Sequence, residues 1–111
     1  MALFMWMGKY TPEAGKAIVE GESNREEMAR ATVEAAGGKL IGFYGLIGQD
    51  YHVALIADMP GTAEYLGVAM TASLSGAIAD FKTIPMYDTA TLNKARTVAK
   101  AVKQVYQPPG S

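Results

Sequence analysis

Runs of apolar residues, separated by glycine and proline, predict four strands along the chain. The first run includes Leu3, Phe4 and Trp6 and is closed by Gly8. Short apolar runs bounded in this way are typical of strands. The predicted strands cover residues 3–9, 39–47, 51–57 and 78–86. A turn over residues 48–50 joins the second strand to the third and makes them a hairpin.

Capping residues and helical spacing of apolar positions predict the helices. Thr11 before Pro12 is typical of a helix start, and Ser23 followed three residues later by Glu26 forms a capping-box pattern. The last helix is the most periodic, with one apolar stripe. That stripe contains Leu92, Ala95, Ala99, Val102 and Tyr106. The predicted helices cover residues 12–19, 23–36, a segment rich in small residues from 62 onward, and 89–106.

The order of these elements predicts an α+β fold. Strand, helix, strand, strand, helix, strand is the split βαβ pattern of ferredoxin-like domains, here β-α-β-β-α-β with a C-terminal helix added. We therefore expect a ferredoxin-like domain over residues 1–88, followed by a C-terminal helix and Pro-rich tail over residues 89–111.

Both faces of the predicted sheet are apolar. In the first strand Leu3 and Met5 lie on one face, while Phe4 and Trp6 lie on the other. A sheet with one face in water would alternate apolar and polar residues. Two helices cover only one face, so we expect a second copy of the chain to cover the other through an isologous contact. The sequence thus predicts a homo-oligomer.

Composition and charge exclude several classes of function. The 111 residues are 50% hydrophobic and 19% charged, as in one globular domain. A net charge of −1 gives no indication of nucleic-acid binding, and the absence of cysteine excludes disulfides and thiolate metal sites. No apolar stretch approaches the roughly 20 residues of a membrane span. We expect a cytoplasmic protein without nucleic-acid or membrane partners.

His52 is the candidate catalytic residue. It is the sole histidine, and imidazole exchanges protons near neutral pH more readily than other side chains. A structural or solvent-facing role for His52 remains the alternative. One histidine with scattered aspartates does not reproduce the clustered spacing of metal ligands, so we expect no metal site and no cofactor.

Aromatic residues are the candidate ligand-binding residues. An apolar wall with a few hydroxyl donors is typical of small-molecule sites. The candidates are Trp6, Tyr44, Tyr51 and Phe81. Ordinary core and interface packing is the alternative for all four, because aromatic side chains are prominent in both settings.

Several segments resemble the GYD domain family, a member of the dimeric α+β barrel group. The matching segments are residues 9–12 (KYTP), 23–25 (SNR), 37–40 (GGKL), 56–60 (IADMP), 73–77 (SLSGA) and 106–110 (YQPPG). The resemblance implies a ferredoxin-like subunit that pairs its sheet with that of a second copy. The family's Gly-x-Tyr-Asp motif is altered: residues 48–52 read GQDYH, with one additional residue and His52 where the family has Asp.

Three functions remain open on the sequence alone. The first is a homo-oligomeric protein that binds a small apolar or aromatic molecule in an apolar cavity. The second is a cofactor-independent monooxygenase or isomerase that uses His52 as acid or base. The third is a non-catalytic assembly or partner-binding module. In that case the C-terminal helix, which carries four basic residues and no acidic one, would act as an arm.

Overall fold

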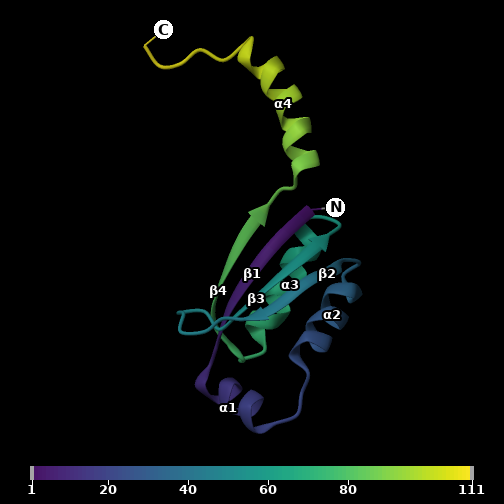
Figure 1. The fold of residues 1–111 in the computed structure, drawn as a ribbon, viewed down its shortest axis with the longest axis vertical. Helices are drawn as coiled ribbons and strands as arrows, with labels where there is room; N and C mark the ends of the chain where they lie inside the picture. Colours follow the sequence, from purple (N-terminus) through teal and green to yellow (C-terminus); the bar gives the residue numbers. More distant parts are fainter. Residues whose placement is uncertain (1, 111) are drawn as a thin grey trace.

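A four-stranded antiparallel sheet forms the centre of the molecule, as the computed structural model of residues 2–110 shows (Figure 1). The elements are β1 (Ala2–Tyr10), α1 (Pro12–Glu20), α2 (Arg25–Ala35), β2 (Lys39–Gly45), β3 (Val53–Met59), α3 (Thr62–Leu74), β4 (Ile78–Met86) and α4 (Thr89–Lys103). The strand order is β2-β3-β1-β4, with every neighbouring pair antiparallel. The ferredoxin-like α+β prediction is confirmed. Residue 1 of the predicted domain 1–88 and residue 111 of the predicted tail 89–111 lie outside the described residues.

Local chemistry explains two departures from the predicted boundaries. The hairpin strands end at Gly45 and begin at Val53, so the connecting loop is longer than the predicted turn. The backbone N–H of Leu46 donates to the carbonyl of His52 at 2.9 Å and closes this loop. The N-cap of α2 is Asn24 rather than Ser23: its side chain accepts from the Glu27 N–H at 3.1 Å. Asn is as effective a cap as Ser.

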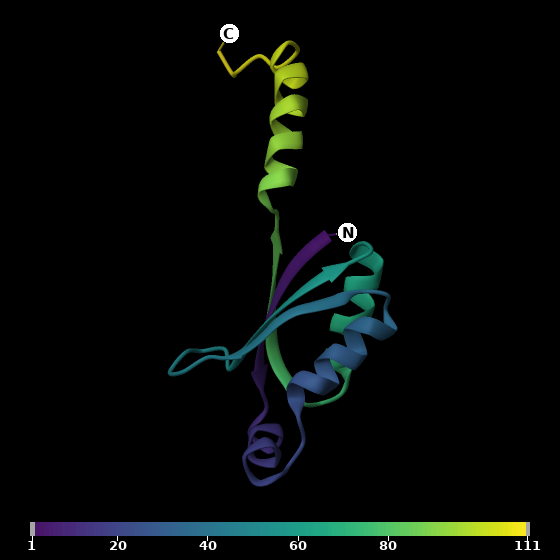
Figure 2. The ribbon, with the colours of Figure 1, turned by 45° about the vertical axis from the view of Figure 1, so that its right-hand side comes forward.

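Helices α2 and α3 cover the same face of the sheet, and the core lies beneath them (Figure 2). Strands contribute six of the nine buried core residues that the structure describes, and helices α2 and α3 contribute Val33, Tyr65 and Ala69. The nine residues are Phe4, Trp6, Val33, Leu40, Val53, Ala57, Met59, Tyr65 and Ala69. The ring of Phe4 stacks on that of Tyr65 at a centroid distance of 4.3 Å, which ties α3 to β1.

The other face of the sheet carries no helix and is apolar at its centre. The strand register places Met5 opposite Ile56 on one side and opposite Ile84 on the other. These side chains are only partly buried, and Ile84 is 40% exposed. This helix-free face carries charged residues at its margins, including Asp58 opposite Leu3 and Lys82 opposite Met7. Its apolar and aromatic residues are Leu3, Met5, Met7, Tyr44, Ala54, Ile56, Ile84 and Met86.

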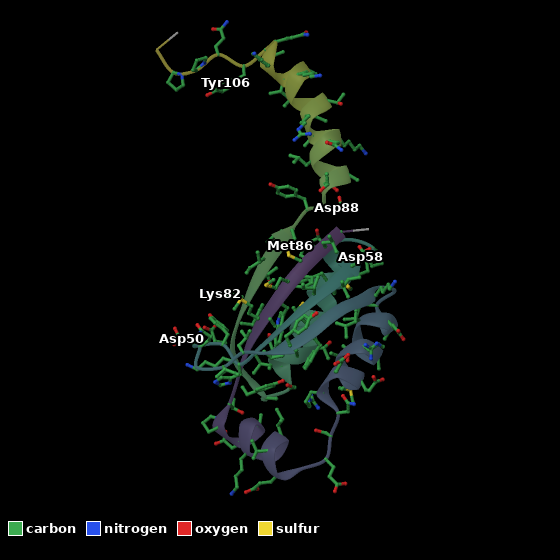
Figure 3. All side chains as sticks on the ribbon, in the orientation of Figure 1. Asp50, Asp58, Lys82, Met86, Asp88 and Tyr106 are labelled. Carbon is green, nitrogen blue, oxygen red and sulfur yellow. The ribbon has the colours of Figure 1, made fainter. Side chains whose placement is uncertain are left out.

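Helix α4 stands clear of the sheet. It continues from the end of β4 and points away from the domain, and Figure 3 places Tyr106 at the far end of this arm. None of its residues is buried. The side chain of Asp88 caps α4 by accepting a hydrogen bond from the Thr91 N–H at 2.8 Å. Hydrogen bonds from the backbone and side chain of Thr91 lower the pKa of Asp88.

Candidate functional site

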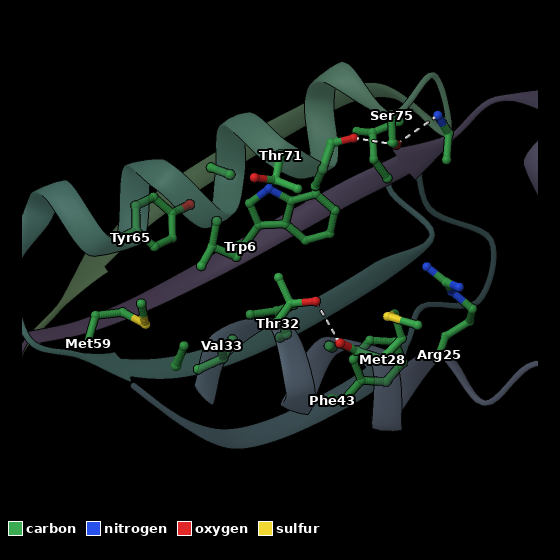
Figure 4. A pocket seen from close by; sticks show the side chains of 18 of the residues that line it. Trp6, Arg25, Met28, Thr32, Val33, Phe43, Met59, Tyr65, Thr71 and Ser75 are labelled. Carbon is green, nitrogen blue, oxygen red and sulfur yellow. Dashed lines mark hydrogen bonds between the residues drawn. The ribbon is translucent and has the colours of Figure 1, made fainter. Parts of the chain in front are cut away.

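An apolar pocket lies between the sheet and helices α2 and α3. Its volume is about 290 Å³, at the lower limit of small-molecule sites. Met59 and Tyr65 lie at one end of this pocket, and Arg25 and Ser75 lie at the other (Figure 4). The remaining walls come from all four strands and from both helices.

Small side chains on the two helices leave room for this pocket. Ala29 on α2, and Ala69 and Ala72 on α3, line it where longer side chains would reach the sheet. The strands provide the larger wall residues, including Trp6 and Phe43. Helix α3 is held at this distance by Tyr65, which packs on Phe4. The hollow therefore results from pairing alanine-rich helix faces with an aromatic sheet face.

Trp6 forms much of the sheet side of the pocket. Its indole ring folds over Gly8, where an added Cβ would overlap the ring. It also stacks on Phe81 with the ring centroids 6.3 Å apart. The indole Nε1 is buried and has no hydrogen-bond partner among the described residues.

Most hydroxyl groups in the pocket wall are already bonded to the backbone of their own helix. Thr32 donates to the carbonyl of Met28 at 2.8 Å, and Thr71 donates to that of Gly67 at 2.9 Å. Ser75 donates to the Ala72 carbonyl at 2.6 Å. These hydroxyls contribute little to ligand specificity, because their donor capacity is used within the protein.

Arg25 and Tyr10 supply polar groups to the pocket wall. Both line the pocket, and both are partly buried. Burial raises the pKa of the Tyr10 hydroxyl, and the neighbouring Arg25 guanidinium opposes this rise through its positive charge and a hydrogen bond to the hydroxyl. Tyr10 is therefore a neutral hydrogen-bonding group beside a cation at neutral pH.

The four predicted ligand-binding residues are distributed over different surfaces. Trp6 alone lines this pocket. Tyr44 is 61% exposed on the helix-free face, and the Tyr51 hydroxyl donates to Asp80 at 2.9 Å. Phe81 lines a second hollow on the outer side of α3. Ligand roles for Tyr44, Tyr51 and Phe81 stay predictions.

His52 lies outside the pocket, at the end of the hairpin loop. The imidazole Nδ1 accepts a hydrogen bond from the backbone N–H of Tyr10 at 3.1 Å. The backbone N–H of His52 donates to the Gly8 carbonyl at 2.9 Å. The neutral imidazole therefore carries its proton on Nε2. The ring stacks beside Tyr10, with centroids 6.1 Å apart. The catalytic role of His52 stays a prediction.

Sequence reasoning missed Arg25 and Tyr10. Both lie in segments that resemble the GYD family, residues 9–12 and 23–25, but that resemblance assigns them no role, and only the fold brings them to one pocket. A weak signal was present in the predicted small-residue helix from residue 62. Alanines at inward positions of a helix leave space beneath it, although they do not reveal how much.

Metal-binding clusters and membrane-spanning helices are absent from the described residues. Residues 2–110 contain no group of three or more His, Asp or Glu side chains placed to hold a metal ion. Within the same range, every helix is too short or too polar to cross a membrane.

Comparisons with known proteins define the fold and the family. The solution structure of the C-terminal domain of the MgtC protein from Mycobacterium tuberculosis is similar, with a TM-score of 0.51 and 16% sequence identity. The match covers 78% of this chain and 88% of that one, and at this identity it concerns the fold alone. No curated protein matches the sequence. The model of the GYD domain matches residues 4–96, and the chain belongs to the GYD domain family.

Proposed function

We propose that the protein binds a small, largely apolar organic molecule in the pocket between the sheet and helices α2 and α3. The observation that carries this proposal is an apolar space of about 290 Å³ beneath the two helices. Protein interiors are otherwise close-packed, and apolar cavities left empty reduce stability. A ligand that fills this space would bury its own apolar surface and that of the walls.

The size of the pocket suits a molecule of one or two rings. A dry cavity of about 150 Å³ accommodates benzene. The present pocket has about twice that volume, and Arg25 lies at one end of it. A phenyl ring with a short alkyl chain matches these dimensions.

Filling the pocket from within the chain tests the proposal. Ala72→Leu extends a side chain from α3 into the space, whereas Ala63→Leu adds the same atoms to an exposed position of the same helix. The neutral probe is 4-phenyl-1-butanol, measured by isothermal titration calorimetry. Trp6 is the only tryptophan, so its fluorescence reports from the pocket wall.

We expect the parent chain and Ala63→Leu to bind the alcohol and to change their Trp6 emission. Ala72→Leu should lose binding while its melting temperature stays the same or rises, because the added methyl groups fill a cavity. Undiminished binding by Ala72→Leu, or no binding by the parent chain, would contradict the proposal.

A second candidate function, homo-oligomeric assembly, is supported by the helix-free face and α4. Met5, Ile56 and Ile84 form an apolar surface that a second copy would bury. Asp58 lies on the same face, opposite Leu3 in the strand register. One of its carboxylate oxygens is buried without a hydrogen-bond partner among the described residues. Exposed contiguous apolar patches typically mark contact surfaces. Assembly and ligand binding use opposite faces of the sheet and are compatible.

A further inference from the structure

We infer that the ligand of this pocket is an apolar carboxylate, held by Arg25 at one end with its apolar body between Trp6 and Val33. This inference rests on the proposed function and adds the chemical class of the ligand. It depends on three features: an unpaired guanidinium, a wall without acidic groups, and hydroxyls that are already bonded.

Arg25 has no acidic partner. Among residues 2–110, the ion pairs join Arg30 to Glu26 at 3.1 Å and to Glu27 at 2.6 Å. Both acidic residues in the first turn of α2 are therefore paired with Arg30, which does not line the pocket. The guanidinium of Arg25 lies at one end of the pocket without an acidic partner (Figure 4).

The position of Arg25 is unfavourable for the helix itself. It is the first residue of α2, where the partial positive charge of the helix N-terminus opposes a cation. The side chain is also partly buried, with the Tyr10 hydroxyl as a neutral hydrogen-bonding partner, and burying a charge without a counter-ion is costly. A bound anion would offset both effects, which gives this cation a function in binding that it lacks in folding.

The rest of the wall favours a single-charged head with an apolar body. The lining residues include no Asp or Glu, and Thr32, Thr71 and Ser75 donate to their own helices. One planar guanidinium matches one carboxylate in a two-pronged hydrogen bond. A phosphate dianion would leave charge uncompensated, because Arg25 is the only cationic residue among the lining residues.

A matched pair of probes tests this inference. We would compare 4-phenylbutanoate with 4-phenyl-1-butanol, which differ only in the head group, by calorimetry at neutral pH. The parent chain should bind the carboxylate at least about tenfold more tightly than the alcohol, because charge-assisted hydrogen bonds are stronger than neutral ones.

Arg25→Gln assigns the preference to one side chain. In this variant the affinity for the carboxylate should fall to that for the alcohol, while the affinity for the alcohol stays unchanged. Arg30→Gln removes the same charge from the same helix outside the pocket and should keep the preference. The melting temperature of unliganded Arg25→Gln should be equal to the parent's or slightly higher, since the variant removes a cation from a helix N-terminus.

The possible outcomes separate this inference from the proposed function. Equal affinities of the parent chain for the two probes would overturn the carboxylate inference and leave the apolar site standing. A preference that persists in Arg25→Gln would also overturn it. Binding of neither probe would contradict the pocket as a ligand site altogether.

Discussion

Trp6 and Gly8 set the shape of the pocket at the scale of single residues. They lie two positions apart on β1 and thus on the same face, and the indole occupies the space that a side chain at Gly8 would need. The ring is held on its other side by Phe81. The pocket wall therefore depends on the absence of a side chain at one buried position.

Gly8→Ala should displace the Trp6 ring. Overpacking of this kind typically lowers the free energy of unfolding by about 1–3 kcal/mol. We expect a lower denaturation midpoint, a shifted Trp6 emission maximum and weaker binding of 4-phenyl-1-butanol. Gly45→Ala is the control, because an added Cβ there meets no atom within 4 Å. Equal stability and equal emission of the two variants would show that a side chain at position 8 does not displace the Trp6 ring.

His52 should act first as an anchor for the backbone of β1. His52→Ala removes the acceptor of the Tyr10 N–H and should lower the free energy of unfolding by about 0.5–1.5 kcal/mol, the usual net value of one hydrogen bond. His52→Asn places an amide oxygen near the position of Nδ1 and should restore much of the loss. Chemical denaturation measures both. If Ala and Asn variants were equally stable, the hydrogen bond would contribute nothing measurable.

Sequence reasoning at this scale identified Trp6 because a large aromatic residue on an apolar strand is visible in a pattern. It did not identify Arg25, because an arginine at a helix start is ordinary until the fold places it over a cavity. His52 was singled out for its chemistry, whereas its hydrogen bonds to β1 follow from the path of a loop that no pattern specifies.

Helix α4 stands clear of the other elements that the structure describes, and none of its residues is buried (Figure 1). Its apolar stripe remains in solvent, with Val102 54% exposed and Tyr106, just beyond the helix, 64% exposed. Isolated helices of about 12–15 residues are only marginally stable in water. Assembly with a second copy would bury this stripe.

Removal of α4 by truncation after Asp88 tests this element. The shortened chain should keep its melting temperature within a few degrees, since α4 contributes no buried residue. Its self-association should weaken by about tenfold or more if burial of the stripe contributes even about 1.4 kcal/mol. Sedimentation equilibrium of both chains gives the association constants. An unchanged association constant would exclude α4 from assembly.

The elements themselves were largely predictable because their signals are local. Thr11 caps α1 with Pro12 in its first turn, as expected, and Gly37, with φ of 85°, follows the end of α2. The length of the β2–β3 loop was not predictable from its glycine, since the long-range bond between Leu46 and His52 decides where the strands separate.

The whole molecule presents two apolar surfaces on opposite sides of one sheet. One is enclosed by α2 and α3 and includes the pocket, whereas the helix-free face is open. The alternation of residues in β1 was sufficient to predict that both sides are apolar. It could not indicate that one side contains a hollow, because cavity volume depends on how far Ala69 and Ala72 stand from the sheet.

A charge placed on the helix-free face should separate the copies without unfolding the chain. Ile84 is 40% exposed in the single chain, so Ile84→Lys should be tolerated there but not in an apolar interface. Ile47→Lys, at a loop position that is 95% exposed, is the control.

Sedimentation velocity at micromolar concentration should give about twice 11.8 kDa for the parent chain and Ile47→Lys, and 11.8 kDa for Ile84→Lys. A folded parent chain that sediments at 11.8 kDa would rule out assembly through this face.

The location of a bound apolar molecule tests the central claim most directly. Intermolecular nuclear Overhauser effects between 4-phenyl-1-butanol and a labelled chain distinguish the two faces of the sheet. We expect contacts from the phenyl protons to the Val33 and Ala69 methyl groups and to the Trp6 indole, all of which line the pocket. Contacts confined to Met5 and Ile84, on the helix-free face, would contradict the claim.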